Sequence, residues 1–337
     1  MDPIAALQRI AYLLERRGVP LYRSRAFRRA AEAIDGVGLD EVRRRVEDGS
    51  LLELRGIGET TGQVIEQAIR GETPEYLARL EGEFAAASPS PAAELRARLR
   101  GDCHSHTLWS DGKSSIEETA RAARALGHEY LVITDHSPKL TIARGLTAER
   151  LGAQLELIAR LNEQFAPFRI MTGIEVDILD DGSLDQSPEL LSRLDVVVAS
   201  VHGKLRMDEK AMTERMLAAV RNPHADVLGH CTGRIVVGKG RPESTFDAER
   251  VFAACAEHDK AIEINSRPER LDPPRRLLRL ANAIGCRFCI NTDAHTPGQL
   301  EWQENGCERA VECGLLPERI VNGWDCDALL AWTASHG

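Results

Sequence analysis

Hydrophobic and polar positions follow two different periods along the chain, and the change between them falls near residue 90. In the first part, Phe27, Ala30, Ala31 and Ile34 recur at the three- and four-residue spacing that places them on one face of a helix. In the second part, short apolar and β-branched runs alternate with longer helical patterns. The chain is therefore predicted to hold a small all-helical domain followed by a larger α/β domain.

The segment between the two patterns has the composition of a linker. Residues 84–94, FAAASPSPAAE, are rich in Ala, Ser and Pro and have no apolar period. We therefore expect an N-terminal domain over residues 1–82, a linker over residues 83–100 and a C-terminal domain over residues 101–337. The length of 337 residues fits one large domain and one smaller domain.

The apolar runs of the second part are short enough to be strands. Because helical patterns separate them, they predict parallel strands with helical crossovers, in a barrel or a large open sheet. The runs are YLVITDH (130–136), IMTGIEVDI (170–178), DVVVASVH (195–202), ADVLGH (225–230), AIEIN (261–265) and CRFCINTDAH (286–295).

Histidines and acids stand at or just beyond the ends of these strands. In a (β/α) barrel such positions share one face, where active sites are built. His104 and His106 flank one residue of an extended segment, so both side chains point the same way and can reach one cation. The candidates exceed the roughly four to six ligands of one ion, so several ions are expected. They are His104, His106, Asp111, His136, Glu175, His202, His230, Asp293 and His295.

Composition narrows the class of protein. Hydrophobic content of 43% with 28% charged residues is ordinary for a globular protein, and no apolar run approaches the length of a membrane helix. The N-terminus lacks the pattern of a secretory signal, so we expect a cytoplasmic protein without disulfides. The net charge of −9 arises after residue 100, because residues 1–100 hold sixteen arginines and sixteen acids.

The motifs HSHTLWSDG, ITDHS, GIEVDIL, SVHGK, LGHCTGR, EIN and NTDAH resemble the PHP (polymerase and histidinol phosphatase) superfamily. The intervening text resembles the PHP domain of bacterial family X DNA polymerases. This resemblance implies a distorted (β/α)7 TIM-like barrel with two or three divalent ions, Zn²⁺ or Mn²⁺, with Fe²⁺ as a further option. It also implies three ligand sets: His104, His106, Glu175 and Asp293 for the first ion; Glu175, His202 and His230 for the second; Asp111, His136 and His295 for the third.

Such a cluster supplies a metal-activated hydroxide and neutralises phosphoryl oxygens, which suits phosphoester hydrolysis. We expect Glu175, Asp293 and Arg234 to be catalytic, and Arg234 and Lys204 to hold the substrate phosphate. For both cations the alternative is a solvated surface charge. Cys231 departs from the family pattern, in which proline is common, and we expect it to affect loop rigidity more than chemistry.

The N-terminal part contains Gly56-Ile57-Gly58 before a predicted helix, over about residues 59–71. Glycines there let backbone amides face an anion at a helix N-terminus. The segment resembles the helix-hairpin-helix domain of family X polymerases, which implies DNA contacts by Gly56 and Gly58. Arginines of YRSRAFRRAAEAI could add phosphate contacts, or could be the exposed face of an ordinary helix. They are Arg23, Arg25, Arg28 and Arg29.

Three functions fit these features. The first is a metal-dependent nuclease of DNA repair, acting as a 3′-5′ exonuclease or on 3′ ends or abasic sites. The second is a small-molecule phosphatase of the histidinol-phosphatase type, and the third is a DNA-binding protein with a regulatory barrel. Polymerisation is not expected, because no nucleotidyltransferase domain lies between the two parts, and no lysine precedes Lys113 for Schiff-base lyase chemistry. Metal identity and oligomeric state stay open.

Overall fold

The computed structural model describes residues 1–84 and 90–336. They belong to two compact units, residues 1–88 and residues 89–337, which are described separately. None of the described helices combines the length and the apolar character that crossing a bilayer requires.

The first unit is all-helical, as expected. Its core contains the predicted face of α2 (Leu21–Val37), since Phe27, Ala30, Ala31 and Ile34 are all buried. The turn at residues 56–58 follows a 3-10 turn, Leu51–Glu53, and precedes α4 (Glu59–Ile69), so the helix-hairpin-helix arrangement is present. The helices are α1 (Pro3–Arg16), α2 (Leu21–Val37), α3 (Leu39–Asp48), α4 (Glu59–Ile69) and α5 (Glu75–Glu83).

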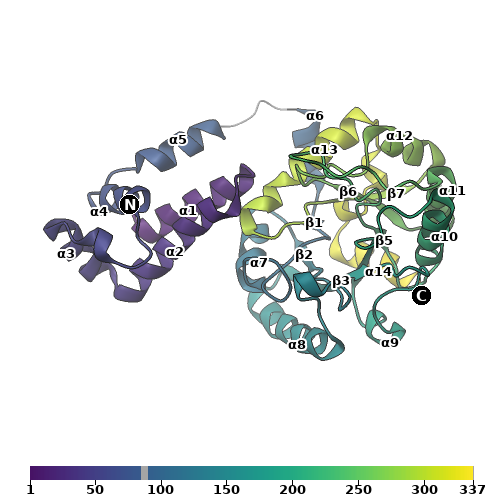
Figure 1. Ribbon diagram of the computed structural model, residues 1–337, viewed down its shortest axis with the longest axis horizontal. Coiled ribbons are helices and arrows are strands. Elements are labelled where there is room, and N and C mark those ends of the chain that lie inside the picture. The colour runs from purple at the N-terminus through teal and green to yellow at the C-terminus, as the bar shows by residue number, and fades with distance from the viewer. Residues whose placement is uncertain (85–89, 337) are drawn as a thin grey trace. The chain divides into compact units, whose positions relative to one another are not determined.

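The second unit is a nearly closed barrel of seven parallel strands in sequence order, with helices around it (Figure 1). This confirms the predicted fold class. The strands are β1 (Gly101–Asp102), β2 (Tyr130–Ile133), β3 (Arg169–Asp177), β4 (Val196–Ser200), β5 (Val227–Leu228), β6 (Ala261–Asn265) and β7 (Arg287–Asn291). The helices are α6 (Pro91–Arg98), α7 (Ile116–Ala125), α8 (Ala148–Phe165), α9 (Pro188–Leu191), α10 (Glu209–Val220), α11 (Ala248–Glu257), α12 (Arg275–Ile284), α13 (Gln303–Glu312) and α14 (Cys326–Ala334).

The first and last strands approach each other just past their C-terminal ends. Ser105 and Ala294 form a parallel bridge, and the amide of His106 donates to the carbonyl of Ala294 over 2.7 Å. The amide of Cys103 donates to the side chain of Asn291. These contacts bring the segment after β1 beside the segment after β7, which carries Asp293 and His295.

The barrel interior is closed at the N-terminal ends of its strands. Inward-facing residues there, such as Tyr130 and Val196, pack in one cluster with Leu329 and Trp332 of α14. Because the barrel interior at this end is filled with apolar side chains, a site inside the barrel is expected at the C-terminal ends of the strands.

The expected linker over residues 83–100 needs correction, because part of it is helical. Helix α6 lies within it, and Leu95 and Leu99 are buried in the core of the barrel unit. Ser90 caps the helix by accepting from the amide of Ala93, and Pro91 occupies its first position. The middle of the expected linker, residues 85–89, lies outside the described residues.

Candidate metal centre

The structure brings all nine predicted ligands together at the C-terminal ends of the barrel strands. His104 and His106 follow β1, His136 follows β2, Glu175 lies in β3, His202 follows β4, His230 follows β5, and Asp293 and His295 follow β7. Asp111 comes from the loop after β1. Most are buried because the loops enclose them, and His104 and Glu175 are at most 1% exposed.

Glu175 is the centre of the cluster. Its Oε1 lies 3.2 Å from His202 Nε2 and 2.8 Å from His230 Nε2. Its Oε2 faces three further imidazoles, at 3.4 Å from His104, 3.5 Å from His106 and 2.9 Å from His136. One buried carboxylate therefore contacts five imidazoles, which fits the bridging position expected from the family resemblance.

Asp111 organises a second part of the cluster. Its Oδ1 lies 3.3 Å from His295 Nε2 and 3.5 Å from His136 Nε2. His106 approaches the same oxygen with Nδ1 at 3.9 Å, while its Nε2 lies 3.4 Å from Asp293 Oδ1. His106 thus lies between the first and third predicted ligand sets.

Three groups of these residues place their ligand atoms within 4.8 Å of one another. The groups overlap the predicted sets but do not repeat them, because His106 joins the Asp111 group and His136 joins Glu175 and His202. The groups are His106, Asp111, His136 and His295; His104, His106 and Glu175; and His136, Glu175 and His202.

The nitrogen atoms of the cluster fit metal ions better than a hydrogen-bonded network. Buried polar atoms in proteins normally have hydrogen-bond partners. Here several imidazole nitrogens lack hydrogen-bond geometry although carboxylate oxygens are near: His104 Nε2, both nitrogens of His106, His136 Nδ1 and His202 Nε2. Imidazole nitrogen and carboxylate oxygen are also the donors that Zn²⁺ and related transition metals prefer.

Burial and neighbouring charges set the protonation of the cluster. Burial favours the neutral acid at Glu175, but His202, His104 and His136 hold its pKa well below the usual range. Burial together with His136 and His295 lowers the pKa of His106 to about 4. Against the effect of burial, Glu263 and Glu175 raise the pKa of His104, and Glu175 and Asp177 raise the pKa of His202 to about 9. Because metals bind the ionised carboxylate and the neutral imidazole, metal binding would release protons from these two histidines.

Glu263 contacts two of the predicted ligand residues, His104 and His230, and the sequence analysis assigned it no role. This fully buried carboxylate in β6 lies 2.6 Å from His104 Nδ1 and accepts from the amide of His230 over 2.7 Å. Asn291 and Asn265 donate to it as well. A carboxylate at Nδ1 keeps the proton there, which turns the lone pair of Nε2 toward Glu175. The feature of the sequence that could have identified Glu263 is an acidic residue inside an apolar strand run.

Two arginines of the loop after β6 reach the cluster, and these were also missed. Arg270 Nε lies 3.2 Å from Asp293 Oδ2, and Arg267 Nη1 lies 3.5 Å from Asp293 Oδ1. Arg267 also lies 3.1 Å from His295 Nδ1. Asp293 itself has a positive φ of 54°, a conformation that Asp tolerates better than most residues. The arginines therefore lie where an anionic substrate would meet the ligands.

The contacts of Arg234 and Lys204 do not support the predicted phosphate clamp. The Arg234 guanidinium donates to the carbonyl oxygens of Arg270 and Leu271. Lys204 Nζ pairs with Asp180 at 2.6 Å, and its side chain is 67% exposed. Sequence position places both cations after strands that carry predicted metal ligands, but it does not give the contacts that their side chains make.

The hairpin of the first unit has some of the geometric features of an anion-binding site. Gly56 has a φ of 99°, which glycine adopts without strain. The amide of Gly58 donates to Thr61 Oγ1 over 2.9 Å, while the next amides form the first turn of α4 and have no intrahelical acceptor. These residues line a pocket of about 580 Å³ together with Tyr22 and Arg23.

The predicted DNA-contacting arginines separate into two kinds. Arg25 and Arg29 are exposed. Arg28 instead makes a bidentate ion pair with Glu15, at 2.8 and 2.9 Å, and Glu15 is 1% exposed. Arg28 is therefore engaged within the helical unit, which argues against its predicted role as a DNA contact.

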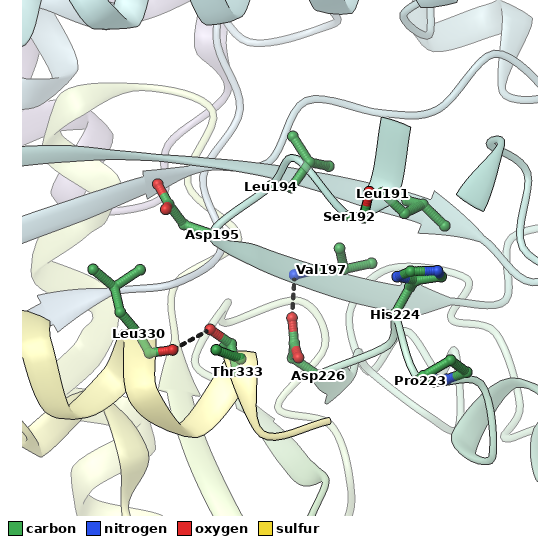
Figure 2. A pocket seen from close by; sticks show the side chains of 11 residues that line it. Leu191, Ser192, Leu194, Asp195, Val197, Pro223, His224, Asp226, Leu330 and Thr333 are labelled. Carbon is green, nitrogen blue, oxygen red and sulfur yellow. Dashed lines mark hydrogen bonds between the residues drawn. The ribbon is translucent and has the colours of Figure 1, made fainter. Parts of the chain in front are cut away.

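A separate pocket of about 340 Å³ lies at the other end of the barrel, before β4 and β5 (Figure 2). Asp226 accepts from the amide of Val197 there (Figure 2). Asp195 accepts from the amide of Thr172. None of the described metal-ligand groups includes these residues. The pocket has the position of stability-related features in barrels rather than of an active site.

Two family models match the chain. The PHP domain model matches residues 102–267, and the helix-hairpin-helix domain model matches residues 1–74.

Known proteins match as well. The "DNA polymerase/3′-5′ exonuclease PolX" of Bacillus subtilis is 39% identical to this chain over 225 residues. The match covers 67% of this chain and 39% of that protein, so the chain spans well under half of the length of that relative. A "probable phosphatase" of Caldanaerobacter subterraneus is 31% identical over 214 residues, covering 60% of this chain and 78% of that protein. Among solved structures, histidinol phosphate phosphatase of Lactococcus lactis, complexed with zinc, L-histidinol and phosphate, has a TM-score of 0.47 and 19% identity, covering 65% and 95% of the two chains.

Proposed function

Because the chain belongs to the PHP family, we propose that it is a metal-dependent phosphoesterase that acts on DNA, as a 3′-5′ exonuclease or in the processing of 3′ ends or abasic sites. The observation that carries the proposal is the gathering of six imidazoles and three carboxylates at one end of the barrel. A helix-hairpin-helix unit in the same chain supplies the reason to choose DNA as substrate.

The ligand sets would hold two or three divalent ions, Zn²⁺ or Mn²⁺. When bound, such ions supply Lewis acidity toward a phosphoryl group and lower the pKa of water. His104, His106, Glu175 and Asp293 would hold one ion, and Glu175 with His202 and His230 another. Asp111, His136 and His295 would hold a third.

The chain's own cations would position the substrate. We assign the phosphate-binding role to Arg267 and Arg270, because both guanidinium groups lie against Asp293 at the edge of the cluster. Arginine side chains bind phosphoryl oxygens through paired hydrogen bonds and stabilise charge that develops on them. Glu263 would keep His104 in the tautomer that binds metal.

A second candidate function is a small-molecule phosphatase. The relatives named probable phosphatases favour it, because the match covers most of their length. In that case the helical unit would be a scaffold without a part in substrate binding. Variants of the helical unit therefore separate the two functions.

We expect the Arg25→Glu and Arg29→Glu double variant to raise KM for a DNA substrate by roughly tenfold and to leave kcat unchanged, because binding remote from the chemistry is removed. The slope of log KM against log salt concentration should decrease by about two, that is, by about one for each phosphate contact removed. Steady-state kinetics at several salt concentrations measures both. Arg43→Glu, in which the arginine pairs with Asp40 on its own helix, is the control. An unchanged KM for DNA would favour the phosphatase.

A further inference from the structure

A small pocket lies between the loops that follow β4 and β5, and none of the predicted metal ligands lines it. It has a volume of about 240 Å³. Arg206 and Arg241 line it together with the apolar side chains Leu205, Met207 and Pro242. We call it the outer pocket. Two guanidinium groups beside an apolar wall suit a phosphate joined to a sugar and base.

The outer pocket is fixed to the metal centre through both of its loops. His202 stands three residues before Leu205, and His230 stands three residues before Gly233. Gly233 has a φ of 61° and packs on Leu205, where an added Cβ would lie 2.7 Å from Leu205 Cδ2. Ser244 ties the loops together, since its hydroxyl donates to the carbonyl of Leu205 over 2.8 Å. A group in the pocket is therefore held at a set position relative to two metal ligands.

The pocket is lined by two cations, Arg206 and Arg241, and by one acid, Glu243. No carboxylate within residues 1–84 and 90–336 forms an ion pair with Arg206 or Arg241. Arg241 Nε donates to the carbonyl of Gly233 over 2.6 Å, which restrains its guanidinium against the loop that follows β5. Glu243 also lines the pocket, but its carboxylate already pairs with Arg234 and Arg276. The remaining charge is complementary to an anion.

We propose that the outer pocket binds a second phosphate of a polynucleotide, next to the phosphate that reacts at the metal centre. The inference rests on the proposed function, because it assigns a substrate subsite to the same active site. A phosphate monoester has one phosphate, which Arg267 and Arg270 would hold, and it needs no second cationic pocket. A polynucleotide has a phosphate at every residue, and its sugar and base would lie on Leu205, Met207 and Pro242.

The test uses the full-length, metal-loaded protein with Arg206→Glu, because Arg206 is exposed and its replacement should not disturb folding. We expect KM for single-stranded oligothymidylate to rise about tenfold. The slope of log KM against log salt concentration should decrease by about one. KM for thymidine 3′-monophosphate should not change. Arg241→Gln should act in the same direction. The control is Arg193→Glu, an exposed cation before β4 at the other end of the barrel. An unchanged oligonucleotide KM, or an equal rise for the monoester, overturns the inference.

A second measurement separates this inference from the proposed function. Oligothymidylate with phosphorothioate linkages is used as an inhibitor of thymidine 3′-monophosphate hydrolysis. Its inhibition constant should rise about tenfold in Arg206→Glu. An unchanged inhibition constant overturns the outer pocket even if the wild-type protein cleaves DNA. Wild-type protein that binds the inhibitor through Arg206 but cleaves no DNA overturns the proposed nuclease and leaves the outer pocket in place.

Discussion

Glu175→Gln is expected to lower phosphoester hydrolysis by at least about a hundredfold and to reduce the metal content of the protein, while the barrel stays folded. The substitution keeps the volume of the side chain but removes the negative charge. A glutamine amide presents one acceptor oxygen where the carboxylate presents two. The two carboxylate oxygens together face five imidazoles, those of His104, His106, His136, His202 and His230.

Elemental analysis of the purified protein tests this directly. We expect two or three transition-metal ions per wild-type chain and at least one fewer in Glu175→Gln, with unchanged circular dichroism. Asp226→Asn is the matched control, because Asp226 is also a buried acid of the barrel but lies at the other end. Wild-type metal content and rate in Glu175→Gln would show that the cluster is not a metal centre.

Arg28→Ala is expected to destabilise the helical unit by roughly 3 kcal/mol, which for a unit of this size lowers its Tm by on the order of 10 °C. The reason is the nearly complete burial of Glu15, whose carboxylate would be left without its bidentate partner. Removal of one member of such a pair costs more than the pair contributes to stability, because the remaining charge stays away from water.

Differential scanning calorimetry measures this change, and Arg29→Ala is the control. Arg29 is the next residue of the same helix and is exposed, so its replacement should leave Tm nearly unchanged while weakening DNA binding. The opposite pattern, with a stable Arg28→Ala that no longer binds DNA, would place Arg28 on the DNA surface, as its position in the sequence suggests.

Much of the barrel could be predicted from sequence because its pattern is local. Most of the apolar runs end in a histidine or an acid, and parallel strands bring their C-terminal ends to one face. The convergence of most of the nine candidate ligands could therefore be predicted from strand ends, whereas Asp111 comes from the loop after β1. The overlap of the ligand groups at His106 and His136 could not be predicted from strand ends, because it depends on the rotation of side chains within a crowded site.

The side-chain contacts that the sequence did not predict join residues far apart in the chain. Nothing in the local pattern around Arg28 reveals that Glu15 of the preceding helix binds it. Arg234 follows a ligand as a phosphate-binding residue would, yet its guanidinium turns to carbonyl oxygens about 36 residues further along the chain. Helix α6 is different, since Ser90 and Pro91 are a recognisable helix start that linker composition obscured.

We propose that this PHP protein hydrolyses phosphoesters of DNA. The most direct measurement is kcat/KM of the intact, metal-loaded protein for single-stranded DNA, a 3′-phosphorylated duplex and L-histidinol phosphate under one set of conditions. We predict the highest value for one of the two DNA substrates, with disappearance of activity after chelation. A protein that turns over L-histidinol phosphate far faster than either DNA substrate would contradict the claim and identify a small-molecule phosphatase.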